Sequence, residues 1–138
     1  MNAIFEHAVD VRWQDSDALG HVNHAVFLTY LEEGRDAFLS QTLGGEPDYV
    51  VARLEVDLRA EVRRPQQRVT VRIEADRLGT TSLTTRETIL TESGQVAAQA
   101  RVVTVRWDPS NRKPAPFTET ERAKLATAID HATPSHDA

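Results

Sequence analysis

The chain has 138 residues, which is enough for one domain with a sizeable core and too few for two ordinary domains. Its formal net charge is −5, and its 16 Lys and Arg residues form no basic block among the 21 acidic residues, so the charge excludes the footprint of a nucleic-acid-binding protein. The absence of cysteine excludes a disulfide framework, a thiolate metal site and a cysteine nucleophile, so any chemistry must come from carboxylates, histidines or hydroxyls.

The first predicted element is a strand from Phe5 to Trp13, because apolar and polar residues alternate there with the period of a half-buried strand. The N-terminus has neither the basic start nor the apolar block of a secretory signal. No later apolar run approaches the length of a membrane span. We therefore expect a cytoplasmic protein with no membrane or nucleic-acid partner.

A long helix is predicted over residues 24–40. Its apolar positions recur with the spacing of one helix face, at Phe27, Leu28, Leu31, Gly34 and Phe38. A glycine inside a helix costs about 1 kcal/mol relative to alanine, so Gly34 indicates close packing of the helix against a sheet. The Gly-Gly-Glu-Pro run at residues 44–47 then ends the helix.

Four strands joined by short turns are predicted after this break. Their expected spans are 53–62, 69–75, 82–91 and 96–107. The first of them has the cleanest alternation in the chain, with Leu54, Val56, Leu58, Ala60 and Val62 on one side. Short turns imply antiparallel neighbours, so the early helix is expected to pack across one curved antiparallel sheet.

The C-terminal part is predicted to form a short helix that ends near residue 131, because Thr118 and Glu121 have the spacing of a capping box. Residues 133–138 are expected to be a frayed tail. The predicted class is therefore α+β, with a single domain over residues 1–132. It contains a five-stranded antiparallel sheet wrapped around a long helix, plus the short C-terminal helix.

Ionisable residues gather just before the long helix, in Asp15-Ser16-Asp17-Ala18-Leu19-Gly20-His21-Val22-Asn23-His24. Asn23 is a good N-cap, since its side-chain oxygen can accept a hydrogen bond from a free backbone N–H two or three residues on. The free N–H groups at such a terminus can bind an anion or polarise a carbonyl. Gly20 allows a positive φ that turns the loop back toward them, and Asp17 is the carboxylate expected nearby.

This stretch resembles the motif of hotdog-fold acyl-CoA thioesterases of the 4-hydroxybenzoyl-CoA thioesterase type, and the predicted order of elements agrees over nearly the whole chain. The match consists of Asp17-x-x-Gly20-His21-Val22-Asn23-His24-Ala25, then Phe27-Leu28, Tyr30-Leu31-Glu32-Glu33 and Arg35. The resemblance implies the hotdog fold. It also implies a homodimer, often assembled further into tetramers, with the acyl-CoA at the subunit interface and no metal or prosthetic group.

The resemblance further implies that Asp17 is the catalytic carboxylate, as nucleophile or as general base, and that the backbone N–H of His24 polarises the thioester carbonyl. Elementary chemistry has the same requirements: thioester hydrolysis needs a carboxylate near the carbonyl carbon or a water, and a donor aimed at the developing oxyanion. We therefore take Asp17, His21, Asn23 and the N–H of His24 as the candidate catalytic set.

Other roles stay open for residues around the motif. Asp15 is expected to be only a turn or strand-end residue. His21 either orients Asp17 or is a hydrogen-bonded structural histidine. A metal held by His21, His24 and an aspartate is disfavoured, because their spacing straddles the junction of loop and helix and is poorly specific. Glu33 is a reserve carboxylate, since another hotdog branch places its catalytic acid on this helix.

A basic, hydroxyl-rich rim is expected for the phosphates and the pantetheine arm of coenzyme A. One group of candidates is Arg59, Arg63 and Arg64, and the other is Arg77, Thr80, Thr81 and Ser82. Each arginine also has a simpler interpretation, because most surface arginines on strands are merely solvated.

The favoured function is hydrolysis of an acyl-CoA to a carboxylic acid and coenzyme A. An acyl-carrier-protein thioesterase would use the same chemistry on a protein-borne pantetheine. A non-catalytic acyl-CoA-binding module is a third hypothesis, because one fold hosts many functions. The presence of Asp17 argues against that third hypothesis. Dehydration is disfavoured because the histidine-containing helix signature of hotdog hydratases is not found in the sequence.

Overall fold

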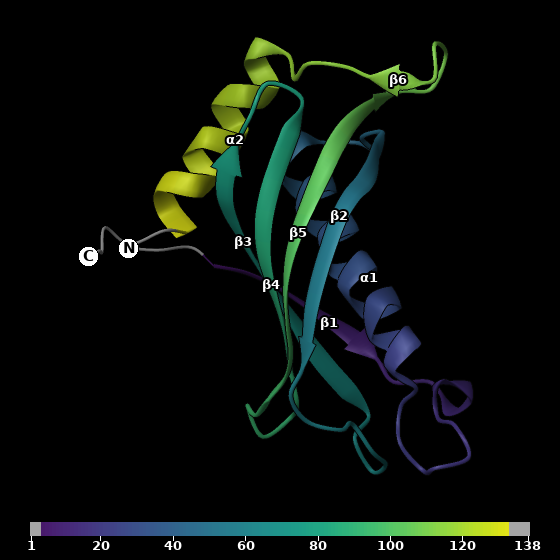
Figure 1. Ribbon diagram of the computed structural model, residues 1–138. Helices are drawn as coiled ribbons and strands as arrows, with labels where there is room; N and C mark the ends of the chain where they lie inside the picture. The colour runs from purple at the N-terminus through teal and green to yellow at the C-terminus, as the bar shows by residue number, and fades with distance from the viewer. Residues whose placement is uncertain (1–3, 133–138) are drawn as a thin grey trace.

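The computed structural model describes residues 4–132 of the chain, in which an antiparallel sheet curves around one long helix (Figure 1). The elements in chain order are β1 (Phe5–Asp10), the 3-10 turn η1 (Trp13–Asp15), α1 (His24–Leu43), β2 (Tyr49–Leu58), β3 (Arg68–Leu78), β4 (Ser82–Leu90), β5 (Val96–Asp108), β6 (Lys113–Pro114) and α2 (Glu119–Ala132). The predicted α+β class and the wrapped arrangement of sheet and long helix are confirmed. The predicted tail at 133–138 lies outside the described residues.

The five long strands are arranged in the order β1-β3-β4-β5-β2, and every neighbouring pair is antiparallel. The two-residue strand β6 pairs with the end of β5 and was not predicted, because two residues carry no periodicity. In Figure 1, α1 lies behind the sheet and α2 lies beside β3. The predicted capping box at the start of α2 is present: the Thr118 N–H donates to Glu121 Oε1 at 2.8 Å, and the Glu121 N–H donates to Thr118 Oγ1 at 3.1 Å.

The predicted boundaries of two strands were wrong. β1 ends at Asp10 because residues 13–15 turn into a 3-10 helix, and β2 covers Tyr49–Leu58 in place of residues 53–62. Past Leu58 the chain bends, since the N–H groups of Arg59 and Ala60 both donate to Ala97 O, at 2.8 and 3.1 Å. Val62 is nevertheless fully buried, so the apolar alternation continues after the strand has ended.

α1 is held close to the sheet by the absence of a side chain at Gly34. A Cβ at this position would overlap the side chain of Val71 on β3, which confirms the close packing predicted for this glycine. The alternating residues of β3 that form the core under the helix are Val69, Val71, Ile73 and Ala75. α1 also runs to Leu43, one turn beyond its predicted end, and is capped by Gly44 with φ 84°.

The helix covers only part of the sheet. α1 packs mainly on β1, β3 and β4, whereas β2 lies at the opposite edge from β1. Leu54 and Leu58 of β2 pair with Val102 and Ala98, both fully buried residues of β5, yet they remain 39% and 54% exposed. The apolar side chains at one side of the core are therefore exposed to solvent along the edge strand β2.

A buried ion pair fixes α1 to β4. Arg35 Nε and Nη2 donate to Glu87 Oε2 and Oε1, each at 2.9 Å, and Thr85 Oγ1 donates to Glu87 Oε2 at 2.7 Å. The two charged side chains are 4% and 0% exposed. Burial lowers the pKa of Arg35, but its hydrogen bonds to Glu87 and the charge of Glu87 outweigh burial and raise that pKa above its usual value. The Nε and Nη2 edge of the guanidinium is thus matched by the two carboxylate oxygens of Glu87.

Glu87→Gln should lower the free energy of unfolding by about 3 to 5 kcal/mol, because it leaves the buried charge of Arg35 without a counter-charge. Glu6→Gln is the matched control, since Glu6 pairs with Arg72 at 2.9 Å on the surface, and its loss should cost less than about 1 kcal/mol. Urea unfolding of both variants measures the difference. Equal losses would show that the buried pair has no special role in seating α1.

Candidate active site

The loop between β1 and α1 folds back on itself through local hydrogen bonds. Ser16 and Val22 form an antiparallel bridge, and between them the Asp17 N–H donates to His21 O at 3.0 Å. The Gly20 N–H donates to Asp17 O at 3.1 Å, and Gly20 has φ 86°, as predicted. This turn brings the side chains of Asp17 and His21 together.

Asp17 presents a partly exposed carboxylate, with its side chain 26% accessible. Its Oδ1 accepts the Leu19 N–H at 2.9 Å, and its Oδ2 lies 3.5 Å from the donor Nδ2 of Asn23. His21 Nδ1 lies 3.8 Å from Asp17 Oδ1 and 3.2 Å from the carbonyl oxygen of Val22. Asp17 is therefore held by neighbours in its own loop while remaining open to solvent.

Asn23 caps α1, as the sequence predicts. Its backbone is extended, with φ −61° and ψ 137°, and its Oδ1 accepts the Ala25 N–H at 2.9 Å. The Val26 N–H donates to Asn23 O at 2.9 Å. Within residues 4–132 the N–H of His24 has no hydrogen-bond partner, so one donor of the first helical turn remains free.

Asn23 is next to both this donor and the carboxylate: it precedes His24 in the chain, and its side chain faces Asp17. The same side chain caps the helix through Oδ1 and faces Asp17 through Nδ2. A carboxylate and an unsatisfied N–H at the positive end of a 20-residue helix thus lie on either side of one residue, Asn23. Such a pair can activate a nucleophile and stabilise negative charge on a nearby oxygen.

A cavity of about 280 Å³ opens beside the N-terminus of α1. Its lining residues are His21, Val22, His24 and Phe27 on one side and Leu58, Arg59, Ala60 and Glu61, from the end of β2 and the bend after it, on the other. Phe27 and Val22 are buried and Leu58 is exposed, so the walls combine apolar surface with a polar rim. Asp17 is not part of this lining, but its Oδ1 lies 3.8 Å from Nδ1 of the lining residue His21.

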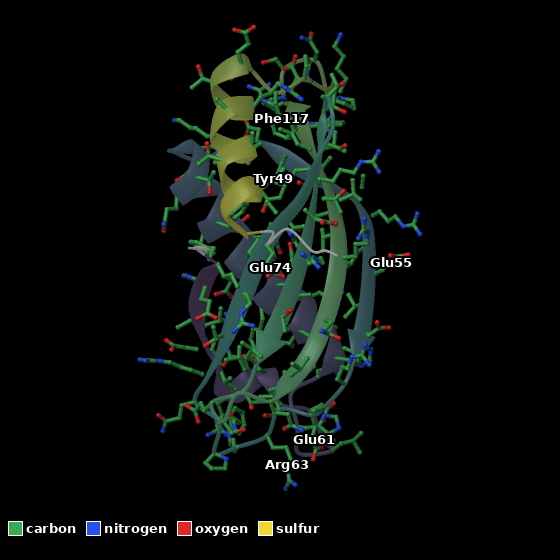
Figure 2. The ribbon with its side chains drawn as sticks, turned by 90° about the vertical axis from the view of Figure 1, so that its left-hand side faces the viewer. Tyr49, Glu55, Glu61, Arg63, Glu74 and Phe117 are labelled. Carbon is green, nitrogen blue, oxygen red and sulfur yellow. The ribbon has the colours of Figure 1, made fainter. Side chains whose placement is uncertain are left out.

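The first group of predicted binding residues lies at this end of the molecule. Arg59 lines the cavity, and Arg63 forms a backbone bridge with His21. Figure 2 places Glu61 and Arg63 at one end of the molecule, with Tyr49 and Phe117 toward the other end. The side chain of Arg59 pairs with Asp57 of β2 at 3.6 Å, and that of Arg63 pairs with Glu61 of its own loop at 3.7 Å. Arg64 follows in the same exposed loop.

The second group lies at the opposite end. Arg77, Thr80, Thr81 and Ser82 surround the turn between β3 and β4. β3 has 11 residues and starts beside the end of β1, so this turn is roughly 35 Å of strand away from the loop between β1 and α1. Arg122 of α2 donates from Nη1 to Gly79 O at 2.7 Å, which attaches the turn to that helix. A single chain does not bring the two predicted groups together.

Two residues near the loop have roles that the sequence did not indicate. Asp15, expected only as a turn residue, is 3% exposed and accepts the hydroxyl of Tyr30 at 2.7 Å. The reserve carboxylate Glu33 is half-buried on α1 and lies 3.9 Å from Arg12 Nη2. No sequence signal joins Asp15 to Tyr30, because they are fifteen positions apart in different elements.

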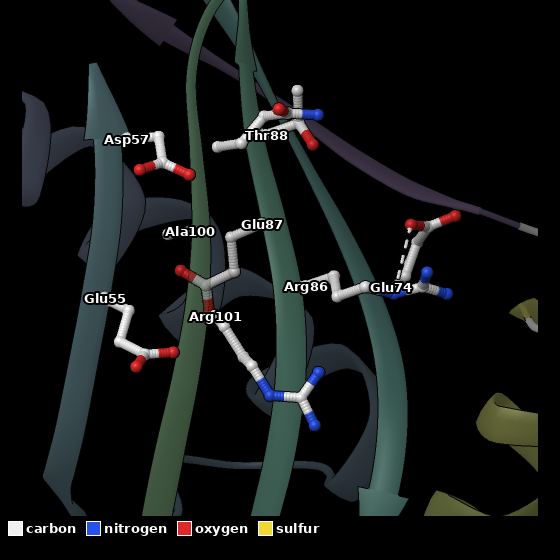
Figure 3. A pocket seen from close by; sticks show the side chains of 9 residues that line it. Glu55, Asp57, Glu74, Arg86, Glu87, Thr88, Ala100 and Arg101 are labelled. Atoms are coloured by element: carbon white, nitrogen blue, oxygen red, sulfur yellow. Dashed lines mark ion pairs between the residues drawn. The ribbon is translucent and has the colours of Figure 1, made fainter.

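A second hollow, of about 310 Å³, lies on the outer face of the sheet (Figure 3). Its arginines already face carboxylates across the strands: Arg86 lies 4.0 Å from Glu74, and Arg101 lies 3.2 Å from Asp76. Paired charges of this kind are typical of a solvated sheet face. We assign no chemistry to this hollow.

The described part of the chain offers no cluster of metal ligands and no membrane-spanning helix. No three His, Asp or Glu side chains of residues 4–132 are placed to hold a metal ion together. Neither α1 nor α2 combines the length and apolar character needed to cross a membrane.

Two of three comparisons relate the chain to known proteins. The model of the Thioesterase-like superfamily matches residues 11–125. Among solved structures, a predicted thioesterase from Bacillus stearothermophilus has a TM-score of 0.82 and 29% identity, over 92% of this chain and 97% of that one. No match was found among curated proteins.

Two further structures contain coenzyme A. A thioesterase from Thermus thermophilus, complexed with coenzyme A and Zn, has a TM-score of 0.78 and 32% identity, over 92% of this chain and 95% of that one. A Staphylococcus aureus protein in complex with CoA has a TM-score of 0.88 and covers 100% of this chain and 91% of its own, but at 14% identity it shows the fold alone.

The 4-hydroxybenzoyl-CoA thioesterase type within the family remains a prediction from the motif. The family match, in contrast, contains the loop, the long helix and the whole of the five-stranded sheet beyond β1. The chain therefore belongs to the thioesterase-like superfamily and has the hotdog fold.

Proposed function

We propose that the protein is an acyl-CoA thioesterase that hydrolyses an acyl-CoA to a free carboxylic acid and coenzyme A. The observation that carries this proposal is the place of Asn23 between two groups: its Nδ2 lies 3.5 Å from the Asp17 carboxylate, and the partnerless N–H belongs to the next residue, His24. The apolar wall beside them, formed by Phe27 and Val22, suits an acyl group.

In the proposed reaction the thioester carbonyl oxygen accepts the N–H of His24. Negative charge grows on that oxygen as the carbonyl carbon is attacked, and one such donor is typically worth about 3 to 4 kcal/mol of transition-state stabilisation. The C–S bond then breaks, and the coenzyme A thiolate leaves and takes up a proton. The donor is useful because it has no partner in the protein with which the oxyanion must compete.

Asp17 has two possible roles in this scheme. As a nucleophile it attacks the carbonyl carbon and forms an anhydride, which water then hydrolyses. As a general base it takes a proton from the attacking water. Its partial exposure and its contact with Asn23 suit either role. His21, 3.8 Å from the carboxylate, is proposed to orient it.

Coenzyme A is favoured over other thiols because the Thermus thermophilus relative, at 32% identity, is complexed with it. The guanidinium groups of Arg59, Arg63 and Arg64 lie at the same end as the loop and are proposed to meet its phosphates. An acyl-carrier-protein substrate presents the same pantetheine arm, and a non-catalytic acyl-CoA-binding module would keep the cavity without turnover. A panel of substrates separates the three functions.

We also propose a homodimer built on β2. This edge strand carries Val50, Val51, Leu54 and Leu58 as exposed apolar residues, and α1 leaves its inner face largely uncovered. Antiparallel pairing of β2 with its copy would satisfy the open edge and bury this surface. The two subunits would then point in opposite directions along β2. The partner's turn at 77–82 would therefore lie at the end of the molecule where Asp17 lies. The two predicted binding groups would then share one site.

The first prediction from this proposal concerns hydrolysis itself. The wild-type protein should release thiol from at least one member of a panel of short, long and aromatic acyl-CoAs, and Asp17→Asn should turn over at least about a hundredfold more slowly while still binding. Asp10→Asn, in an exposed pair with Arg68, is the matched control and should keep full activity. Turnover of Asp17→Asn at the wild-type rate would rule out Asp17. Activity on acyl-carrier-protein thioesters alone would favour the alternative substrate.

The second prediction separates the backbone of His24 from its imidazole. His24→Pro removes the N–H at the first helical position, where proline is tolerated, and the extended backbone of Asn23 is compatible with a following proline. Turnover should fall by roughly a hundredfold or more, whereas His24→Ala keeps the donor and should retain most activity.

Steady-state kinetics on both His24 variants, with circular dichroism to confirm folding, measure this difference. An inactive but folded alanine variant beside an active proline variant would assign the chemistry to the imidazole and contradict the mechanism.

The third prediction concerns assembly. The wild-type protein should sediment as a dimer at micromolar concentration, and Leu54→Lys should shift it to monomer by placing a charge on the β2 face. Ile4→Lys is the control, because Ile4 is also 39% exposed but lies beside the opposite edge of the sheet. A wild-type monomer, or equal dissociation by both variants, would contradict a dimer built on β2.

A further inference from the structure

Asp15 connects the candidate loop to the body of α1 by its side chain and to the start of α1 by its backbone. Its carboxylate accepts the Tyr30 hydroxyl at 2.7 Å, and its carbonyl oxygen accepts the Asn23 N–H at 3.0 Å. Asp15 is 3% exposed and Tyr30 is fully buried. We infer that Asp15 and Tyr30 are a positioning pair that sets the placement of Asp17 relative to the N–H of His24, an inference that rests on the proposed function.

The carboxylate of Asp15 has no oxygen available for chemistry. Besides the Tyr30 hydroxyl, Oδ2 accepts the Arg12 N–H at 2.9 Å, and Oδ1 accepts Arg12 Nε at 3.3 Å. Asp17, two positions on, is partly exposed and is held only by its own loop and cap. The two aspartates of this loop therefore have different tasks: Asp15 holds the loop, and Asp17 keeps its carboxylate open to solvent for the proposed reaction.

Tyr30 is suited to this task by its place on the helix. It lies six residues after His24, which is less than two turns, and long side chains on a helix lean back toward its N-terminus. Burial, its hydrogen bond to Asp15 and the charge of Asp15 raise the pKa of Tyr30, so the hydroxyl stays a donor. The loop is thereby attached to the same rigid element that carries the His24 N–H.

The contacts of Asp15, Asn23 and Asp17 together form a closed ring of interactions. Asp15 holds the N–H of Asn23, Asn23 caps α1 and faces Asp17, and Asp17 follows Asp15 by two residues. Loosening Asp15 should shift Asp17 and the helix terminus relative to each other without removing either. Misplacement by about 1 Å can reduce a rate by about a hundredfold, so a small movement is enough to matter.

The test uses Tyr30→Phe, which deletes only the hydroxyl oxygen. Its kcat should fall by at least about tenfold with KM nearly unchanged, because the binding surfaces remain and their alignment is lost. Thr104→Val is the matched control, because it deletes another buried hydroxyl that is not in contact with the loop. This hydroxyl donates to Leu83 O, with an oxygen–oxygen distance of 3.3 Å, and its loss should leave kcat unchanged. Asp15→Asn should reproduce the loss, and the double variant should be no slower than Asp15→Asn alone, since both act through one contact.

A wild-type kcat in Tyr30→Phe, or an equal fall in Thr104→Val, would overturn the inference. Wild-type protein that hydrolyses no thioester would overturn the proposed function, and hydrogen exchange then decides the positioning claim separately. Amides of residues 16–24 should exchange faster in Tyr30→Phe than in Thr104→Val. Equal exchange in the two variants would show that the pair does not hold the loop.

Discussion

The seating of α1 on the sheet is the constraint on which the candidate site depends. Gly34 allows the helix to lie against Val71, and the neighbouring Arg35 is fixed by two hydrogen bonds to Glu87. Close packing and a buried charge pair leave the helix little freedom to rotate or slide. Its N-terminus is therefore held beside the bend after β2, and the Tyr30 hydroxyl on the same helix holds the loop through Asp15. The carboxylate and the free N–H are positioned by one rigid element.

Two open features of residues 4–132 have a proposed use, a backbone donor and a strand edge. One is the N–H of His24, which has no partner within residues 4–132. The other is the β2 edge with its exposed Leu54 and Leu58. Folded proteins satisfy nearly all of their backbone groups, so an open donor beside a cavity and an open edge beside apolar surface are both informative. The first suits an oxyanion and the second suits a second copy of the chain.

Local signals predicted much of this fold and site. The cap at Asn23, the positive φ of Gly20, the capping box at Thr118 and the packing of Gly34 all follow from chemistry within a few residues, and the structure confirms them. The true end of β2 was missed because hydropathy reports burial and not pairing, and Val62 is buried after the ladder has ended. The bond between Asp15 and Tyr30, and the separation of Arg77 from the loop, depend on tertiary geometry that no local pattern records.

The central claim is that a thioester carbonyl binds at the N-terminus of α1 and is polarised there. The most direct measurement is the difference infrared spectrum of an acyl-CoA labelled with ¹³C at the thioester carbonyl and bound to the Asp17→Asn protein, which should bind the ligand and hydrolyse it only slowly. The account predicts that the carbonyl stretch moves to lower frequency than in water, and that this shift is lost when His24→Pro is added. A bound carbonyl at its solution frequency, or the same shift with and without the His24 N–H, would contradict it.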